Sequence, residues 1–243
     1  MSQLAEFIRR YVAVWNERDA DARRQSIAAL WAPGGATCHS QLDARGWAAI
    51  EARVTSAHDK WVRDGGFVFR PRQDAAHHNV VKLVWEMLPA GGGEVAATGL
   101  NVLILDPDGR INSDYQFNEP PAAAPRELAD FVERYVAFWN EGHAHRRRET
   151  LAQLWAEDAL FLSADAERSG HSGIEAEAVD TYAACGAKGF TFQSAGATDG
   201  HHDAIRMSWE MRPRDGGERA AAGFAMLVLD EARRIRRDYQ FAV

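Results

Sequence analysis

The chain has 243 residues, a formal net charge of −7, and ordinary proportions of hydrophobic (46%) and charged (26%) residues. A chain with this negative charge lacks the basic surface that phosphate groups require, which argues against nucleic acid as a partner. No apolar run is long enough to cross a bilayer, and the N-terminal residues lack the pattern of a secretion signal. We therefore expect a cytoplasmic protein that does not enter a membrane.

Residues 85–89 (Trp-Glu-Met-Leu-Pro) recur as residues 209–213 (Trp-Glu-Met-Arg-Pro), and this offset of 124 residues holds along nearly the whole chain. The sequence thus predicts two copies of one domain, each close to the usual size of an independent core. We expect the copies at residues 1–118 and 127–243, joined by a proline-rich linker at residues 119–126. The two cysteines are not equivalent in the repeat, and unpaired thiols fit a reducing compartment.

Each copy begins with apolar residues at the spacing of an amphipathic helix. This first helix ends in Trp-Asn-Glu in both copies, at residues 15–17 and 139–141. A shorter second helix follows, and the Pro-Gly-Gly at residues 33–35 is expected to end it. A third helix is expected over residues 47–61, with its counterpart at about residues 174–185.

Strands are predicted before and after the third helix. A short strand is expected at residues 36–39 and again at residues 159–163. After the third helix the hydrophobic period changes to 2, as at residues 81–87 and 205–211, and glycine-rich hairpin turns follow. Helices followed by strands with short turns predict an α+β domain, in which a curved antiparallel sheet wraps around about three helices.

This order of elements resembles the SnoaL-like branch of the nuclear transport factor 2-like (NTF2-like) superfamily. The resemblance is carried by Arg-Tyr-Val and Trp-Asn-Glu at residues 10–12 and 15–17, by residues 154–159 (Leu-Trp-Ala-Glu-Asp-Ala), and by residues 201–203 (His-His-Asp). It implies tandem cone-shaped domains, each with a mostly apolar pocket at its open end. It also implies that the copies pair through their sheets as a pseudo-dimer within one chain, and it leaves a further homo-oligomer open.

The resemblance also implies roles for single residues. Tyr11 and Tyr135 match the tyrosine that donates to a developing oxyanion in ketosteroid-isomerase-like enzymes. The alternative is a core tyrosine, whose ring packs and whose hydroxyl binds a carbonyl. The family's general base, an aspartate on the first strand, falls near His39 in the first copy and near Ser163 in the second. Histidine could act as a base, although a histidine at a strand end could equally face water; Asp165 is the nearest carboxylate in the second copy.

The family's second oxyanion donor falls at Asn101 in the first copy and at Ala225 in the second. A lone amide on an apolar strand face needs a partner, so we expect Asn101 to line a pocket. The catalytic candidates are therefore Tyr11, His39 and Asn101, and we expect any active site in the first copy. The residues expected to form ligand-binding walls in the two copies are Trp15, His58, Trp85, Tyr135, Trp139, Ser163, Tyr182 and Trp209.

Two histidine pairs, at residues 77–78 and 201–202, resemble a metal site only superficially. Adjacent residues in an extended segment point to opposite sides, and no cysteine or carboxylate cluster accompanies them. We expect turn-surface histidines and no metal. The chain also lacks a glycine-rich nucleotide fingerprint, and no cofactor is predicted.

Three functions stay open at this point. The first is a cofactor-free isomerase, cyclase or hydratase that acts on a small apolar carbonyl compound in the first copy. The second is a non-catalytic protein that binds a small hydrophobic ligand. The third is a pseudo-dimeric scaffold whose pockets are filled by its own tryptophans. Pocket volume separates the third from the others, and pH-dependent turnover separates the first from the second.

Overall fold

The computed structural model describes residues 3–121 and 124–242, and each half of the chain is an α+β unit. The chain divides into two compact units after Pro120. Ala122 and Ala123, which belong to the predicted linker, lie outside the described residues. Within the described ranges, no helix is both long and apolar enough to span a membrane.

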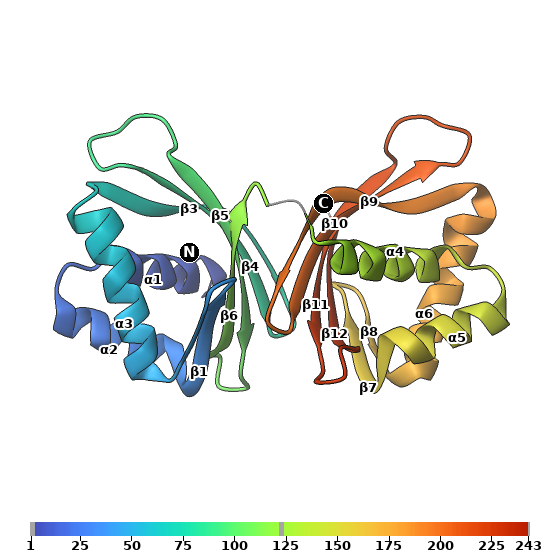
Figure 1. Ribbon diagram of the computed structural model, residues 1–243, viewed down its shortest axis with the longest axis horizontal. Coiled ribbons are helices and arrows are strands. Elements are labelled where there is room, and N and C mark those ends of the chain that lie inside the picture. Colours follow the sequence, from blue (N-terminus) through green and yellow to red (C-terminus); the bar gives the residue numbers. More distant parts are fainter. Residues whose placement is uncertain (1–2, 122–123, 243) are drawn as a thin grey trace. The chain divides into compact units, whose positions relative to one another are not determined.

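The two halves have the same order of elements (Figure 1). The first half contains α1 (Gln3–Asn16), α2 (Ala20–Leu30), β1 (Trp31–His39), β2 (Leu42–Arg45), α3 (Trp47–Ala57), η1 (His58–Arg63), β3 (Phe67–His77), β4 (Val80–Pro89), β5 (Ala97–Leu105) and β6 (Ile111–Glu119). The second half contains α4 (Arg126–Asn140), α5 (Ala144–Leu154), β7 (Trp155–Leu162), β8 (Glu167–Ser169), α6 (Gly170–Ala184), η2 (Gly186–Lys188), β9 (Phe190–His201), β10 (Ala204–Pro213), β11 (Ala221–Leu229) and β12 (Ile235–Ala242).

Each half contains one six-stranded sheet, with strand order β2-β1-β6-β5-β4-β3 in the first half and β8-β7-β12-β11-β10-β9 in the second. The expected antiparallel pairing holds for all neighbours except β1–β6 and β7–β12, which are parallel. No hairpin joins these two pairs, because the rest of the domain lies between the strands in sequence, and that connection allows the parallel direction. In each half the helices lie on one face of the sheet (Figure 1).

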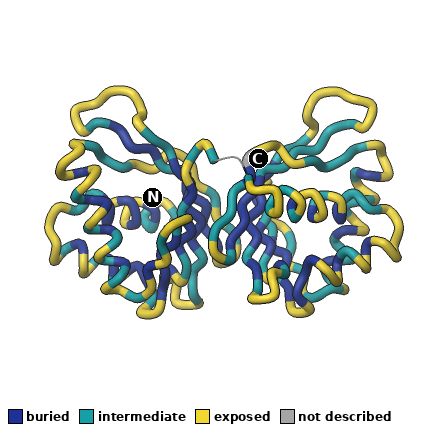
Figure 2. The backbone as a smooth tube through the Cα atoms, in the orientation of Figure 1, coloured by how far each residue is buried: buried dark blue, intermediate teal, exposed yellow. Residues whose placement is uncertain are grey.

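Each half has its own hydrophobic core between its helices and its sheet. The buried positions gather on the strands and on the adjoining parts of the helices (Figure 2). Trp31 and Trp155 are 0% exposed and occupy equivalent places in the two cores. The predicted tandem α+β architecture is therefore confirmed.

The repeated Trp-Asn-Glu motif ties the first helix of each half to a distant strand. Asn16 donates from Nδ2 to the carbonyl oxygen of Phe69 at 2.7 Å and accepts from the Phe69 N–H at 2.9 Å. Asn140 makes the same two bonds to Phe192, at 2.8 and 2.9 Å. Each asparagine amide thus satisfies the same N–H and C=O groups that a neighbouring strand would bind, and these bonds fix where α1 and α4 cross their sheets.

Two local predictions differ from the structure. The Pro-Gly-Gly at residues 33–35 does not end a helix, because α2 already ends at Leu30 and residues 33–35 lie within β1. The pairing of β1 with β6 is irregular between Trp31 and Ala36, and proline and glycine are tolerated at such a bulge. The third helix of the first half is not uniform either, since α3 ends at Ala57 and continues as the π-helix η1.

Candidate functional site

A buried hydrogen-bond network joins α1 to β6 in the first half. The Tyr11 hydroxyl donates to Asp114 Oδ2 at 2.8 Å. Asn101 on β5 donates from Nδ2 to the Tyr11 hydroxyl at 2.6 Å and to Asp114 Oδ1 at 2.8 Å. Thr37 and Gln116 also donate to Asp114 Oδ2, at 3.2 and 3.1 Å. The Asp114 carboxylate, which is 0% exposed, therefore lies among several side-chain donors.

The second half repeats the centre of this network with fewer donors around it. Tyr135 donates to Asp238 Oδ2 at 2.9 Å. Gln240 donates from Nε2 to the Tyr135 hydroxyl at 2.7 Å and also to Asp238 Oδ1. Phe161 and Ala225 stand where the first half has its threonine and asparagine donors, and neither side chain can donate a hydrogen bond.

Burial raises the pKa of both carboxyl groups, that of Asp114 to about 6 and that of Asp238 to about 7. Hydrogen bonds to the ionised form oppose this rise, and Asp114 accepts more of them, so its pKa rises less. Burial and the adjacent carboxylate also raise the pKa of Tyr11 and Tyr135 well above the ordinary value of 10. Both phenols therefore keep their protons at neutral pH.

The direction of each phenol proton limits what the tyrosines can do. A tyrosine has one O–H proton, and in both halves that proton is donated to the buried aspartate. An oxyanion donor must instead direct its proton toward the substrate. In the observed arrangement Tyr11 and Tyr135 hold Asp114 and Asp238 in place, and either hydroxyl would have to leave its aspartate to serve a ligand.

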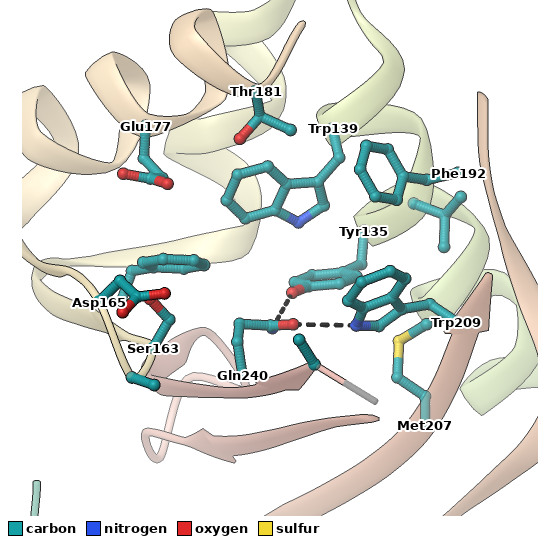
Figure 3. Close-up of a pocket in the computed structure, with 14 residues that line it drawn as sticks. Tyr135, Trp139, Ser163, Asp165, Glu177, Thr181, Phe192, Met207, Trp209 and Gln240 are labelled. Carbon is teal, nitrogen blue, oxygen red and sulfur yellow. Dashed lines mark hydrogen bonds between the residues drawn. The ribbon is translucent and has the colours of Figure 1, made fainter. Parts of the chain in front are cut away.

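A cavity of about 270 Å³ lies in the second half, beside this network. Its apolar walls are Val136, Trp139, Phe161, Phe192, Met207 and Trp209. Its polar lining comes from Tyr135, Gln240, Ser163, Asp165, Glu177 and Thr181. In Figure 3 the two carboxylates, of Asp165 and Glu177, lie on the opposite side of the view from Trp209 and Met207. Trp209 Nε1 donates to Gln240 Oε1 at 3.0 Å, which connects one wall to the buried network.

In the first half, an arginine stands at the position that corresponds to Glu177 of the cavity lining. Arg53 on α3 corresponds to Glu177 on α6 at the 124-residue offset. The Arg53 guanidinium carbon lies 5.2 Å from the centre of the Trp15 ring, and Nη2 donates to Gln116 Oε1 at 3.1 Å. Burial lowers the pKa of Arg53, and the nearby Asp114 partly offsets this effect.

The structure brings two of the three catalytic candidates together. Tyr11 and Asn101 share a hydrogen bond, as described above, whereas His39 lies at the end of β1 and accepts from the N–H of Gln41 at 3.3 Å through Nδ1. Trp85 donates from Nε1 to Asn101 Oδ1 at 2.7 Å. Both amide hydrogens and the carbonyl oxygen of Asn101 therefore have partners inside the protein.

Four of the eight predicted wall residues line the cavity of the second half, whereas Trp15 and Trp85 contact Arg53 and Asn101 in the first half. The four are Tyr135, Trp139, Ser163 and Trp209. Tyr182 packs instead against two glycines, because a Cβ at Gly142 or Gly186 would lie within 2.7 Å of its ring or hydroxyl. His58, its counterpart, is buried at the start of η1, with Nδ1 3.2 Å from Asp59 Oδ1.

Sequence reasoning missed the two buried aspartates. Both stand in the repeated Asp-Tyr-Gln-Phe at residues 114–117 and 238–241, where the alternation of a strand puts Asp and Gln on one face and Tyr and Phe on the other. Tyr115 and Phe117 are themselves buried, so the burial of a residue on β6 does not by itself identify the face that carries the network. The available signal was the identical Asp-Tyr-Gln-Phe at the same place in both copies, which keeps a carboxylate at one strand position, and a carboxylate needs donors when it is buried.

The histidine pairs are arranged differently from the prediction. His78 and His202 have positive φ angles of 47° and 56°, so the chain turns at these residues and is not extended. In each pair the two Nδ1 atoms lie 3.1 Å apart, and the expectation that the rings point to opposite sides is wrong. Among the described residues no group of three or more His, Cys, Asp or Glu side chains could hold a metal ion.

Comparison with known proteins gives matches among solved structures. No family model and no curated protein matches the sequence. A candidate isomerase of the SnoaL-like family from Agrobacterium tumefaciens is 28% identical and has a TM-score of 0.46, with 49% of this chain and 99% of that chain covered. A SnoaL-like protein of unknown function from Burkholderia thailandensis (17% identity, TM-score 0.37) covers 49% of this chain and 98% of its own. An NTF2-like protein of unknown function from an Exiguobacterium species (14% identity, TM-score 0.38) covers 46% and 98%. Each of these three matches covers about half of this chain.

Proposed function

We propose that the second half of the chain binds a small, largely apolar molecule in the cavity beside Tyr135 and Gln240. The observation that carries this proposal is the cavity itself, about 270 Å³ in volume and walled mainly by aromatic and aliphatic side chains. Ligand sites in proteins are concave and mostly apolar, with a few polar groups that fix the orientation, and typical volumes begin near ~300 Å³. The ligand is therefore small.

The polar groups of the cavity support binding more directly than catalysis. Tyr135 and Gln240 already bind Asp238 and each other. Their O–H and N–H protons are therefore all donated within the protein, and the two side chains offer a ligand a fixed polar surface but no proton that is ready for transfer. Apolar contact with the tryptophan and phenylalanine walls supplies the affinity, at roughly 25 cal/mol for each Å² of apolar surface removed from water. The sequence led us to expect ligand-binding walls in both halves and any active site in the first, whereas this proposal places the ligand in the second.

A second candidate function is proton transfer in the same cavity, and Asp165 is the observation that favours it. This carboxylate lines the cavity just after β7, near the place where ketosteroid-isomerase-like enzymes carry their base. A positioned carboxylate in contact with an apolar carbonyl compound can act as a general base. Isomerisation of small cyclic enones, measured with wild type and Asp165→Asn, tests this candidate; turnover that is absent, or unchanged by the substitution, would reject it.

Binding is tested with small neutral ring compounds. We expect cyclohexanone and cyclohexanol to bind in the millimolar range or tighter in ligand-detected NMR titrations. Thr181 lines the cavity on α6, and Thr181→Phe should weaken binding by about tenfold or more because the larger ring fills the space. Thr181→Val, which keeps the volume, serves as the matched control and should bind like wild type. Absence of binding, or equal binding by the phenylalanine variant, would overturn the proposal.

A further inference from the structure

We propose that the ligand of the second-half cavity carries a positive charge, as a small organic ammonium ion whose apolar part contacts the aromatic walls. This inference rests on the proposed function and names the chemical class of its ligand. Three observations carry it: a cation already present at the equivalent place in the first half, its replacement by a carboxylate in the second, and the cavity found where that carboxylate lies.

The first half shows how this part of the fold accommodates a cation. The guanidinium of Arg53 lies over the indole of Trp15 and donates to the side-chain oxygen of Gln116. A cation within about 6 Å of an aromatic centre is attracted by the negative face of the ring. The first half therefore satisfies its tryptophan face and its glutamine oxygen with a side chain of its own.

The second half keeps the tryptophan and the glutamine of this region and removes the cation. Its other contacts differ, because the Trp139 ring packs against Phe161 with the ring centres 5.3 Å apart, and Gln240 Oε1 accepts from Trp209 Nε1. Trp139 and Gln240 occupy the places of Trp15 and Gln116, and both line the cavity. The arginine position is Glu177, whose shorter side chain carries the opposite charge and also lines the cavity. The exchange from arginine to glutamate thus removes a positive group and adds a negative one at the cavity that the equivalent tryptophan lines. A cationic ligand in the cavity would supply the positive charge that Arg53 supplies in the first half, and the aromatic walls would attract it.

The other charges at the cavity favour the same sign of ligand. Asp165 adds a second carboxylate to the lining, and within the described part of the chain it has no ion-pair partner. Arg168 on β8 pairs with Glu177 at 3.0 Å, and its side chain is 39% exposed compared with 19% for the glutamate. Arg168 is therefore a partly solvated counter-ion that offsets some of the negative charge and is screened by water. An anionic ligand would meet two like charges at the cavity wall.

The first experiment compares three probes with the same six-membered ring: cyclohexylammonium, cyclohexanol and cyclohexanecarboxylate. We expect cyclohexylammonium to bind the full chain about tenfold more tightly than the alcohol, and the carboxylate to bind most weakly. The preference should decrease as salt is added, because Asp165 is exposed and Glu177 is partly exposed. Equal or tighter binding of the alcohol would overturn the charge inference and leave the proposed function standing. Failure of all three probes to bind would overturn both.

The second experiment uses two variants that break the same ion pair from its two ends. Glu177→Gln should weaken cyclohexylammonium binding by about tenfold, and should affect the alcohol less. Arg168→Gln should strengthen cyclohexylammonium binding severalfold, because it releases the carboxylate from its counter-ion. A purely structural role of the pair would move both variants in the same direction, and that result would overturn the inference. Glu177→Arg, which copies the first half, should remove binding of both the ammonium and the alcohol.

Discussion

Replacing the buried carboxylate Asp238 by asparagine should change how the stability of the protein depends on pH. Folding raises the pKa of Asp238 from its ordinary value of 3.8 to about 7. Between these two values the native state holds a proton that the unfolded state has released, so the free energy of unfolding of the wild type falls as pH rises. At ~1.36 kcal/mol for each pKa unit, a rise of about 3 corresponds to about 4 kcal/mol.

The quantity to measure is the difference in unfolding free energy between Asp238→Asn and wild type, by urea titration at several pH values from about 4 to about 8. The substitution has its own packing and hydrogen-bond cost, but that cost does not depend on pH. We therefore expect the variant to gain about 4 kcal/mol relative to wild type over this range, with most of the gain complete near pH ~7.

The equivalent substitution in the first half, Asp114→Asn, is the matched comparison. The pKa of Asp114 rises only to about 6, because more side chains donate to its ionised form. Its gain should be smaller, about 3 kcal/mol, and should be complete about one pH unit earlier. A difference that stays flat with pH would show that neither carboxyl has a raised pKa. A variant that instead lost stability relative to wild type as pH rises would mean that the native pKa is lowered, and would refute the argument from burial.

Three further predictions concern the second half. Asn140→Ala removes two side-chain hydrogen bonds to the backbone of β9 and should lower the free energy of unfolding by about 2 kcal/mol, as measured by urea titration. Gly223→Ala places a Cβ 2.2 Å from the Trp209 ring, so the indole must move; we expect a loss of ~1–3 kcal/mol, a change in tryptophan fluorescence and weaker probe binding, and an unchanged variant would contradict the described packing. Tyr135→Phe should change the affinity for cyclohexylammonium while Tyr11→Phe leaves it unaltered; a ligand site in the first half, where the sequence led us to expect any active site, would give the reverse result.

The fold was predictable because its signals are local and occur twice. Apolar residues at helical spacing followed by alternating strands predict the same element type in both copies, and the 124-residue offset confirms each assignment independently. The Pro-Gly-Gly at residues 33–35 misled the prediction because these residues usually end an element, whereas here they fit an irregular stretch of β1. The parallel β1–β6 pair was missed for another reason: hairpin turns reveal only which strands pair with their sequence neighbours.

The site was less predictable because it depends on which residues of distant strands face each other. Sequence reasoning singled out Tyr11 and Asn101, which share a hydrogen bond in the structure, but it did not connect them to Asp114, 103 positions beyond the tyrosine. It did not single out Arg53 or Glu177 at all. These two residues become informative only in the structure, where the Arg53 guanidinium lies over Trp15 in the first half and Glu177 lines a cavity in the second.

The asparagines at the ends of α1 and α4 also bear on self-association. β3 and β9 are the last strands of their sheets, and such edges expose N–H and C=O groups that can recruit a strand from another chain. At Phe69 and Phe192 these groups are already occupied by Asn16 and Asn140. An incoming strand would have to displace an amide held by its own helix before it could pair there. We therefore expect variants that lack these amides to form intermolecular β-structure more readily, even where the monomer still folds.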